Sequence, residues 1–148
     1  MLKIEDLRFS YSKRSAPVLN GIDLDLHDGE IGILLGKNGS GKTTLFKNIL
    51  GIDAPSGGTI RFDGEDLLKL PKRDRARRIA YVPQHIHFGA LTVYDSILMG
   101  RVSYFGLREG KEDYDVVDRI MAEMKLESFA DRNAENLSGG EKQKIAIA

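Results

Sequence analysis

The chain has 148 residues, enough for one domain with a hydrophobic core, and its 41% hydrophobic and 30% charged residues exclude a disordered or fibrous protein. Basic and acidic residues balance at 22 each, so no net charge favours nucleic acid or an anionic membrane as the partner. Cysteine is absent, which excludes a disulfide framework and a thiolate metal site.

The first half of the chain carries the patterns of strands. Residues 2–9 alternate imperfectly between apolar and polar, and residues 18–26 alternate cleanly, which predicts two half-buried strands. Residues 31–35 form a continuous apolar run, typical of a strand buried on both faces, and we expect them to be the central parallel strand. Two further short strands are predicted at residues 59–63 and 79–82.

Helical periodicity follows at several places. A helix is predicted at residues 42–50, and Gly51 provides its stop. Residues 91–99 and 111–125 predict two more helices, the second with one apolar stripe that serves as a packing surface. A last helix begins at Gly139 and continues to the end of the sequence.

A glycine-rich string separates the expected central strand from the first helix. Residues 36–43 read Gly-Lys-Asn-Gly-Ser-Gly-Lys-Thr, the pattern of a phosphate-binding loop, in the strand–loop–helix context that this chemistry requires. Glycines let backbone N–H groups approach phosphates, and the helix N-terminus adds partial positive charge. The sequence therefore predicts an ATP site with the contacts Gly36, Asn38, Gly39, Ser40, Gly41, Lys42, Thr43 and Thr44.

Three side chains of this loop have separate expected roles. Lys42 is expected to reach the β- and γ-phosphates, and the Thr43 hydroxyl to bind the Mg²⁺ that bridges them. Thr44 is expected to add a contact to the α-phosphate. An ordinary glycine turn would explain Gly36 and Gly41, but not Lys42 and Thr43 at these positions.

Residues 137–141, Leu-Ser-Gly-Gly-Glu, allow two interpretations. In a capping box, Ser138 and Glu141 each accept a hydrogen bond from the other's backbone N–H. A capping box does not need two glycines, however, whereas a helix N-terminus that a phosphate approaches closely does. Both interpretations stay open, and Ser138, Gly139 and Gly140 are candidate phosphate contacts.

The two motifs, in this order, resemble the Walker A loop and the signature motif of ABC ATPases. The resemblance covers the whole chain and implies an α/β P-loop NTPase fold with an N-terminal antiparallel β subdomain and an α-helical subdomain. Tyr11 lies where the family stacks an aromatic ring on adenine, unless it is a surface aromatic. Gln84 lies where the family's Q-loop glutamine contacts Mg²⁺ and the attacking water, unless it is a polar loop residue. The resemblance thus implies Lys42 and Gln84 as catalytic residues, and Thr43 and Gln84 as contacts of the metal.

The resemblance also implies a division of the chain. Residues 1–90 would form the β subdomain with part of the P-loop core, residues 91–136 the helical subdomain, and residues 137–148 the signature motif and its helix. The family continues with the Walker B aspartate, the catalytic glutamate and a switch histidine, which this sequence does not contain. We therefore expect the C-terminal part of the core to be missing, hydrolysis by the chain alone to be negligible, and the exposed sheet edge to favour self-association.

In the family, two such domains pair head to tail, so that each ATP lies between one Walker A loop and the signature motif of the other chain. The implied partners are a second ATP-binding subunit, transmembrane permease subunits and, indirectly, a solute-binding protein. No segment resembles a signal peptide or approaches the roughly 20 apolar residues of a membrane-spanning helix. The expected location is therefore cytoplasmic, peripheral on the inner face of the cell membrane.

The transported solute is suggested by a weaker match. Residues 98–101, Leu-Met-Gly-Arg, and residues 104–106, Tyr-Phe-Gly, look most like importers of iron chelates, haem or cobalamin, or belong to the helical subdomain of any ABC importer. The alternatives to an importer subunit are an ABC ATPase without transmembrane partners, acting in translation or repair, and a nucleotide-binding fragment without catalysis.

Two further patterns are given no function. His85 and His87 lack a third convergent ligand, so we expect ordinary loop residues there rather than a metal site. Residues 72–78 are locally basic, but the rest of the chain compensates this charge, and a solvated face rather than a nucleic-acid contact is predicted.

Overall fold

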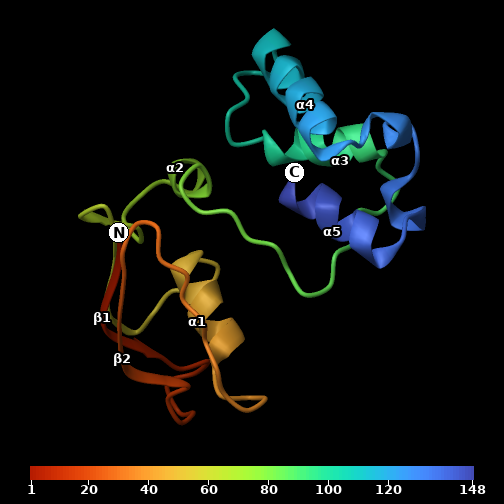
Figure 1. Cartoon of the computed structure of the whole chain (residues 1–148). Helices are drawn as coiled ribbons and strands as arrows, with labels where there is room; N and C mark the ends of the chain where they lie inside the picture. The colour runs from red at the N-terminus through yellow and green to blue at the C-terminus, as the bar shows by residue number, and fades with distance from the viewer. The chain divides into compact units, whose positions relative to one another are not determined.

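A computed structural model describes all 148 residues and divides them into two units, Met1–Ile79 and Ala80–Ala148, each with its own hydrophobic core (Figure 1). The first unit contains the β-sheet, the helix that follows the glycine-rich loop and one short helix. The second unit is helical. The subdomain boundaries expected after residues 90 and 136 stay a prediction.

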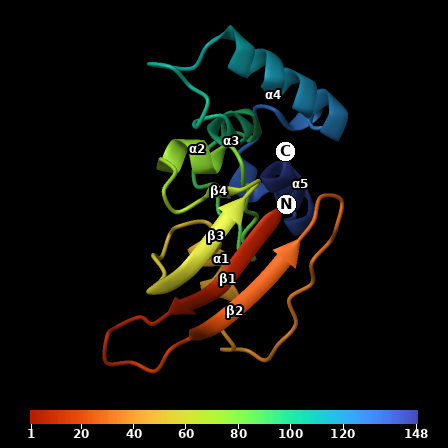
Figure 2. The ribbon, with the colours of Figure 1, turned by 90° about the vertical axis from the view of Figure 1, so that its left-hand side faces the viewer.

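The sheet of the first unit has four strands in the order β2-β1-β3-β4, and every pair is antiparallel. Figure 2 shows β1 between its two long neighbours. The antiparallel β subdomain expected at the N-terminus is therefore confirmed. The strand bounds are β1 Leu2–Phe9, β2 Leu19–Leu26, β3 Gly57–Phe62 and β4 Glu65–Asp66.

One face of this sheet is covered by α1, Lys42–Ile49. Regular alternation would put Ile4 and Leu7 on opposite faces of β1, but a β-bulge between them, where Asp6 has a φ of 47°, brings both to the covered face. There both are fully buried beside Ile60 of β3. Leu45 of α1 packs into the same core. The position of α1 over the sheet fixes where its N-terminus, and with it the glycine-rich loop, lies.

Two predicted strands are wrong. Residues 31–35 are not a strand, and Ile31 and Leu35 are 91% and 85% exposed. A strand buried on both faces needs hydrogen-bonded neighbours, and the four strands of this sheet pair only with one another. Residues 79–82 likewise form no strand, and Tyr81 and Val82 are exposed. The apolar pattern therefore indicated burial that this structure does not provide.

The second unit contains the three predicted helices, α3 Val93–Gly100, α4 Lys111–Met124 and α5 Gly139–Ile147, with two short 3₁₀ helices, η1 Glu127–Phe129 and η2 Ala134–Asn136. Thr92 begins α3 by accepting a hydrogen bond from the backbone N–H of Asp95 at 3.0 Å. The apolar stripe of α4 buries Val117 and Met121 in the core, as predicted. No helix of either unit is both long and apolar enough to cross a bilayer.

Candidate nucleotide-binding site

The glycine-rich loop enters α1 through backbone conformations that favour glycine. Gly39 and Gly41 have φ angles of 80° and 92°, a region that strains any residue with a Cβ. A Cβ on Gly41 would also lie 3.2 Å from the carbonyl oxygen of Val18, so the loop packs closely on the start of β2. Gly41 offers no side-chain cap, and the first-turn N–H groups of α1 have no intrahelical acceptor. This N-terminus therefore presents free donors.

The loop closes around the ammonium group of Lys42. Its Nζ donates hydrogen bonds to the carbonyl oxygens of Gly36 at 2.6 Å and Lys37 at 2.8 Å. The backbone N–H of Ser40 also donates to Lys37, at 3.2 Å. The remaining predicted contacts of the loop, Asn38 and Gly39, are exposed. Lys42 thus lies among carbonyl groups that a phosphate could replace as its acceptors.

The two threonines face different environments. Thr43 is exposed, whereas Thr44 is 5% exposed and its hydroxyl lies 3.0 Å from the hydroxyl of Tyr11. The Tyr11 ring meets Phe9 edge to face, with centroids 5.0 Å apart, and is itself 64% exposed. The structure therefore brings the predicted adenine-stacking residue to the phosphate loop. The Tyr11–Thr44 contact itself is not visible in the sequence pattern.

These residues fit a magnesium-bound polyphosphate. The loop offers backbone N–H donors, the ammonium groups of Lys37 and Lys42 and the exposed hydroxyls of Ser40 and Thr43, and residues 36–44 contain no acidic side chain. The exposed Thr43 oxygen is of the hard type that Mg²⁺ takes alongside phosphate oxygens. When bound, the metal would neutralise phosphate charge, and the residues of this chain would bind and orient the anion.

The signature segment begins α5 as a capping box. The Ser138 backbone N–H donates to the Glu141 carboxylate at 2.8 Å, and the Ser138 hydroxyl donates to the same oxygen at 2.5 Å. These hydrogen bonds lower the pKa of Glu141. A Cβ on Gly139 or Gly140 would meet no atom within 4 Å, so the packing of the chain does not require either glycine. The capping interpretation is confirmed, and the glycines leave space above the helix.

Gln84 lies in the second unit. It borders an open hollow of about 200 Å³ together with His85, His87, Gly139 and Lys142. The structure therefore brings Gln84 beside the first turn of the signature helix within one unit. His87 contacts Glu135, with Nδ1 3.4 Å from its carboxylate.

Glu135 belongs to neither sequence motif, but it occupies a central position beside the signature helix. Its carboxylate accepts hydrogen bonds from Lys142 of α5 at 2.9 Å and from the backbone N–H of Phe88 at 2.8 Å. The Lys142 ammonium is the main cause that lowers the pKa of Glu135 to about 2, and the Phe88 N–H adds to it. Glu135 thus joins the segment after Gln84 to the signature helix. It lies in no motif, so only its proximity to the signature could have suggested it.

The sequence and the fold both match known proteins. An uncharacterized ABC transporter ATP-binding protein of Methanocaldococcus jannaschii is 35% identical over 148 residues, which are all of this chain and 58% of that protein. A probable siderophore transport system ATP-binding protein of Bacillus subtilis, YusV, is 34% identical over 150 residues, with coverage of 99% and 54%. Other relatives are named for spermidine/putrescine or sulfate/thiosulfate import. The chain thus spans little more than half the length of the first two relatives.

A solved structure has the same fold. The cbiO1 protein of Clostridium perfringens, described as part of the ABC transporter complex cbiONQ, superposes with a TM-score of 0.78 at 29% identity. The match covers 99% of this chain and 59% of that one. The family model described as ABC transporter matches residues 19–148, which include both motifs. The chain therefore belongs to the ABC transporter family, with the P-loop fold of its ATP-binding subunits.

Proposed function

We propose that this chain holds Mg-ATP on residues 36–44 as the nucleotide-binding part of an ABC importer's energy-coupling subunit. The observation that carries the proposal is the uncapped N-terminus of α1, reached through the left-handed Gly39 and Gly41, with the Lys42 ammonium at its loop. An anion is stabilised by such a terminus through free N–H groups and the helix dipole. The ATP-binding subunits of this family support the choice of nucleotide.

Each side chain has a proposed role. Lys42 exchanges its carbonyl acceptors for the β- and γ-phosphates, and the exposed Thr43 hydroxyl binds Mg²⁺. Tyr11 stacks on adenine, and Thr44 contacts the α-phosphate. Gln84 contacts the metal and the attacking water in the assembled site. No carboxylate contacts Lys42 or Thr43, so the activity proposed for these two residues is nucleotide binding rather than hydrolysis.

The signature segment supports a shared site. Ser138, Gly139 and Gly140 begin a helix whose glycines are open, as close approach by a phosphate requires. We infer that they touch the nucleotide held by a second ATP-binding subunit in a head-to-tail dimer. The dimer would act on separate transmembrane permease subunits, from the cytoplasmic face of the membrane.

The finer assignment of the solute is an iron chelate, haem or cobalamin. It is supported by the Leu-Met-Gly-Arg string at residues 98–101 and by the siderophore named for the Bacillus subtilis relative. Relatives named for polyamines and sulfate point to other solutes. Transport assays on the complete transporter with a ferric chelate, spermidine and sulfate would decide among them.

Calorimetric titration with Mg-ATP tests the binding function. The chain is expected to bind one nucleotide, and Lys42→Ala to weaken binding by about 100-fold, because charge-assisted hydrogen bonds to phosphate are lost. Lys13→Met, an exposed cation outside the loop, is the control and should change nothing. Equal affinity of the Lys42→Ala and Lys13→Met variants would refute the proposed site.

A further inference from the structure

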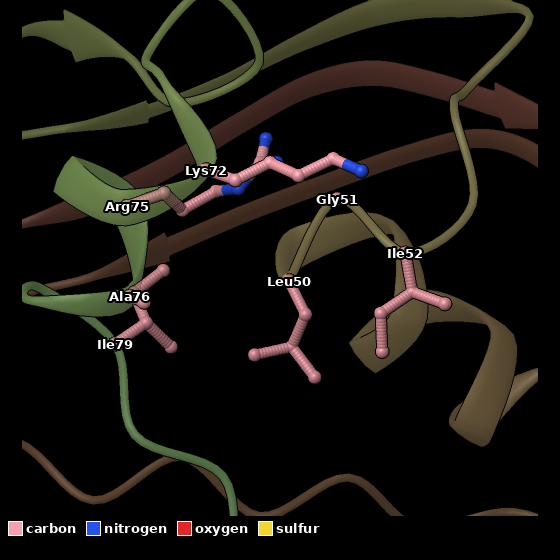
Figure 3. Close-up of a pocket in the computed structure, with 7 residues that line it drawn as sticks. All are labelled: Leu50, Gly51, Ile52, Lys72, Arg75, Ala76 and Ile79. Carbon is pink, nitrogen blue, oxygen red and sulfur yellow. The ribbon is translucent and has the colours of Figure 1, made fainter. Parts of the chain in front are cut away.

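The first unit contains a hollow that the nucleotide site does not use. It has a volume of about 400 Å³ and lies between the end of α1 and α2, Lys72–Ala76. Figure 3 shows Lys72 and Arg75 reaching from α2 toward Gly51, with apolar side chains around the same space. Its lining combines two cations with Leu50, Ile52, Ala76 and Ile79, and includes no acid.

Arg75 is buried but sparsely bonded. It is 8% exposed, and its Nη1 donates one hydrogen bond, to the carbonyl oxygen of Leu67 at 3.1 Å. Its guanidinium lies against Gly51, where an added Cβ would overlap it. The other side-chain nitrogens of Arg75 are not among the fully buried atoms that lack a hydrogen-bond partner. Their unused N–H groups therefore retain access to the two hollows that Arg75 lines.

No counter-charge accompanies Arg75. In the same segment, Arg77 pairs with Asp74 at 3.8 Å and Arg78 with Glu65 at 2.5 Å, whereas Arg75 and Lys72 form no ion pair. A buried charge that has no opposite charge beside it destabilises the folded chain, because burial removes water that would otherwise solvate it. The structure therefore holds Arg75 in a position that an anion would stabilise.

The end of α1 does not replace that anion. The helix dipole places about half a negative charge at its C-terminus, against two cations at the hollow. The carbonyl groups of Phe46, Lys47 and Asn48 already accept hydrogen bonds from the backbone N–H groups of Leu50, Ile52 and Gly51. The hollow therefore keeps a net positive charge and unused donors.

We propose that this hollow binds a small carboxylate with a short apolar chain. The planar guanidinium of Arg75 matches the two oxygens of a carboxylate, and Lys72 supplies a second charge at the rim. The apolar chain would lie on Leu50, Ile52 and Ile79. A bound anion would link α2 to the end of the helix that begins at the phosphate loop.

An NMR titration with isovalerate tests this site, followed through the backbone amides of the whole chain. Isovalerate is expected to shift the amides of Gly51, Ile52 and Ala76, whereas isovaleramide, of the same shape but uncharged, should shift none of them. Arg75→Met should weaken binding by about tenfold or more, and Lys72→Met by less. Lys69→Met, an exposed cation outside the hollow, is the matched control.

Two further arms keep the result unambiguous. Arg75→Met also removes the hydrogen bond to the Leu67 carbonyl oxygen, so a second variant, Ala76→Leu, is needed. It fills the hollow from the exposed side of α2, leaves the guanidinium in place and should abolish binding. Titration of Lys42→Ala removes any binding at the phosphate loop and should leave the shifts at Gly51 unchanged. Equal binding of the amide, shifts confined to residues 36–44, or binding of an acidic peptide but not of isovalerate would each overturn the proposal. If isovalerate fails to bind while Mg-ATP still binds, the carboxylate site is refuted and the proposed nucleotide site is unaffected.

Discussion

The two units each present the N-terminus of a helix, but they satisfy it differently. In the first unit, α1 follows the left-handed Gly41, which gives no side-chain cap, and its loop contains no acid. In the second unit, α5 begins at Ser138, whose backbone N–H and hydroxyl both donate to the Glu141 carboxylate. The first terminus thus leaves its donors free, while the second already holds a negative charge of the chain itself.

This difference explains why the two motifs should not act alike. The free N–H groups of α1 can bind an anion without first breaking hydrogen bonds of their own. Only Lys42 has to exchange its carbonyl acceptors for the anion. At α5, a phosphate would meet the carboxylate of Glu141 and would compete for the Ser138 hydroxyl. Such a site suits a nucleotide that is already anchored elsewhere, as in the proposed head-to-tail dimer. We therefore expect α1 to bind nucleotide alone and α5 to contribute only when a second subunit brings it.

The largest expected effect comes from substitutions in the two hydrophobic cores, which test whether the two units unfold separately. Leu7 of the first core and Leu126 of the second are fully buried. Leu7→Ala and Leu126→Ala should each lower the stability of their own unit by about 2–5 kcal/mol, the usual effect of an unfilled cavity. Hydrogen exchange, resolved by residue, measures this. If either variant lowers protection equally in both units, the units do not unfold separately.

Loss of the cap at α5 should have a smaller effect. Ser138→Ala removes the hydroxyl of the capping box and is expected to cost about 1 kcal/mol in the second unit. Urea denaturation measures the change, with Ser138→Asp, which restores a capping side chain, as the control. A Ser138→Ala variant as stable as the unaltered chain would show that the capping box contributes nothing.

The smallest energetic effect is expected at the Tyr11–Thr44 hydrogen bond of the first unit. We expect Tyr11→Phe and Thr44→Val each to weaken Mg-ATP binding modestly, because each removes one hydroxyl of a 3.0 Å hydrogen bond. A double-mutant cycle by calorimetry should give a coupling of about 0.5–1 kcal/mol between the two hydroxyls. Additive losses would mean that the hydroxyls act independently.

The pH dependence of stability that Glu135 contributes should be confined to acid pH. Its pKa is lowered to about 2, chiefly by Lys142, so the folded second unit binds fewer protons than the unfolded chain. The stabilisation is therefore complete above the ordinary value of 4.5 and is lost as the pH falls toward 2. Urea midpoints at successive pH values should decline less steeply in this range for Glu135→Gln. An unchanged slope would contradict the role given to this carboxylate.

Much of the fold could be predicted because the deciding signals are local. The alternation in β2, the stripe of Val117 and Met121 on α4 and the capping residues of α5 each act through neighbouring residues, and the structure confirms them. Residues 31–35 are different, because an apolar run becomes a strand only where other strands lie beside it. That condition cannot be read from the run itself.

The candidate site likewise contains residues that a local pattern identifies and contacts that only the fold creates. The glycine loop, Lys42 and Thr43 are fixed by a pattern of adjacent residues, so the sequence was sufficient to identify them. The partners of Glu135 and Arg75 come from distant segments, and the bonds to Phe88 and Leu67 engage backbone atoms, which carry no sequence signal. Tyr11 was proposed from resemblance alone, and its contact with Thr44 required the fold.

An amide NMR titration of the dilute chain with Mg-ATP tests most directly whether α1 binds nucleotide without α5. We expect shifts at residues 36–44 and at Tyr11, their loss in Lys42→Ala, and no shifts at Ser138, Gly139 or Gly140 while the chain stays monomeric. Shifts that begin at residues 138–140 and leave residues 36–44 unmoved would contradict this expectation.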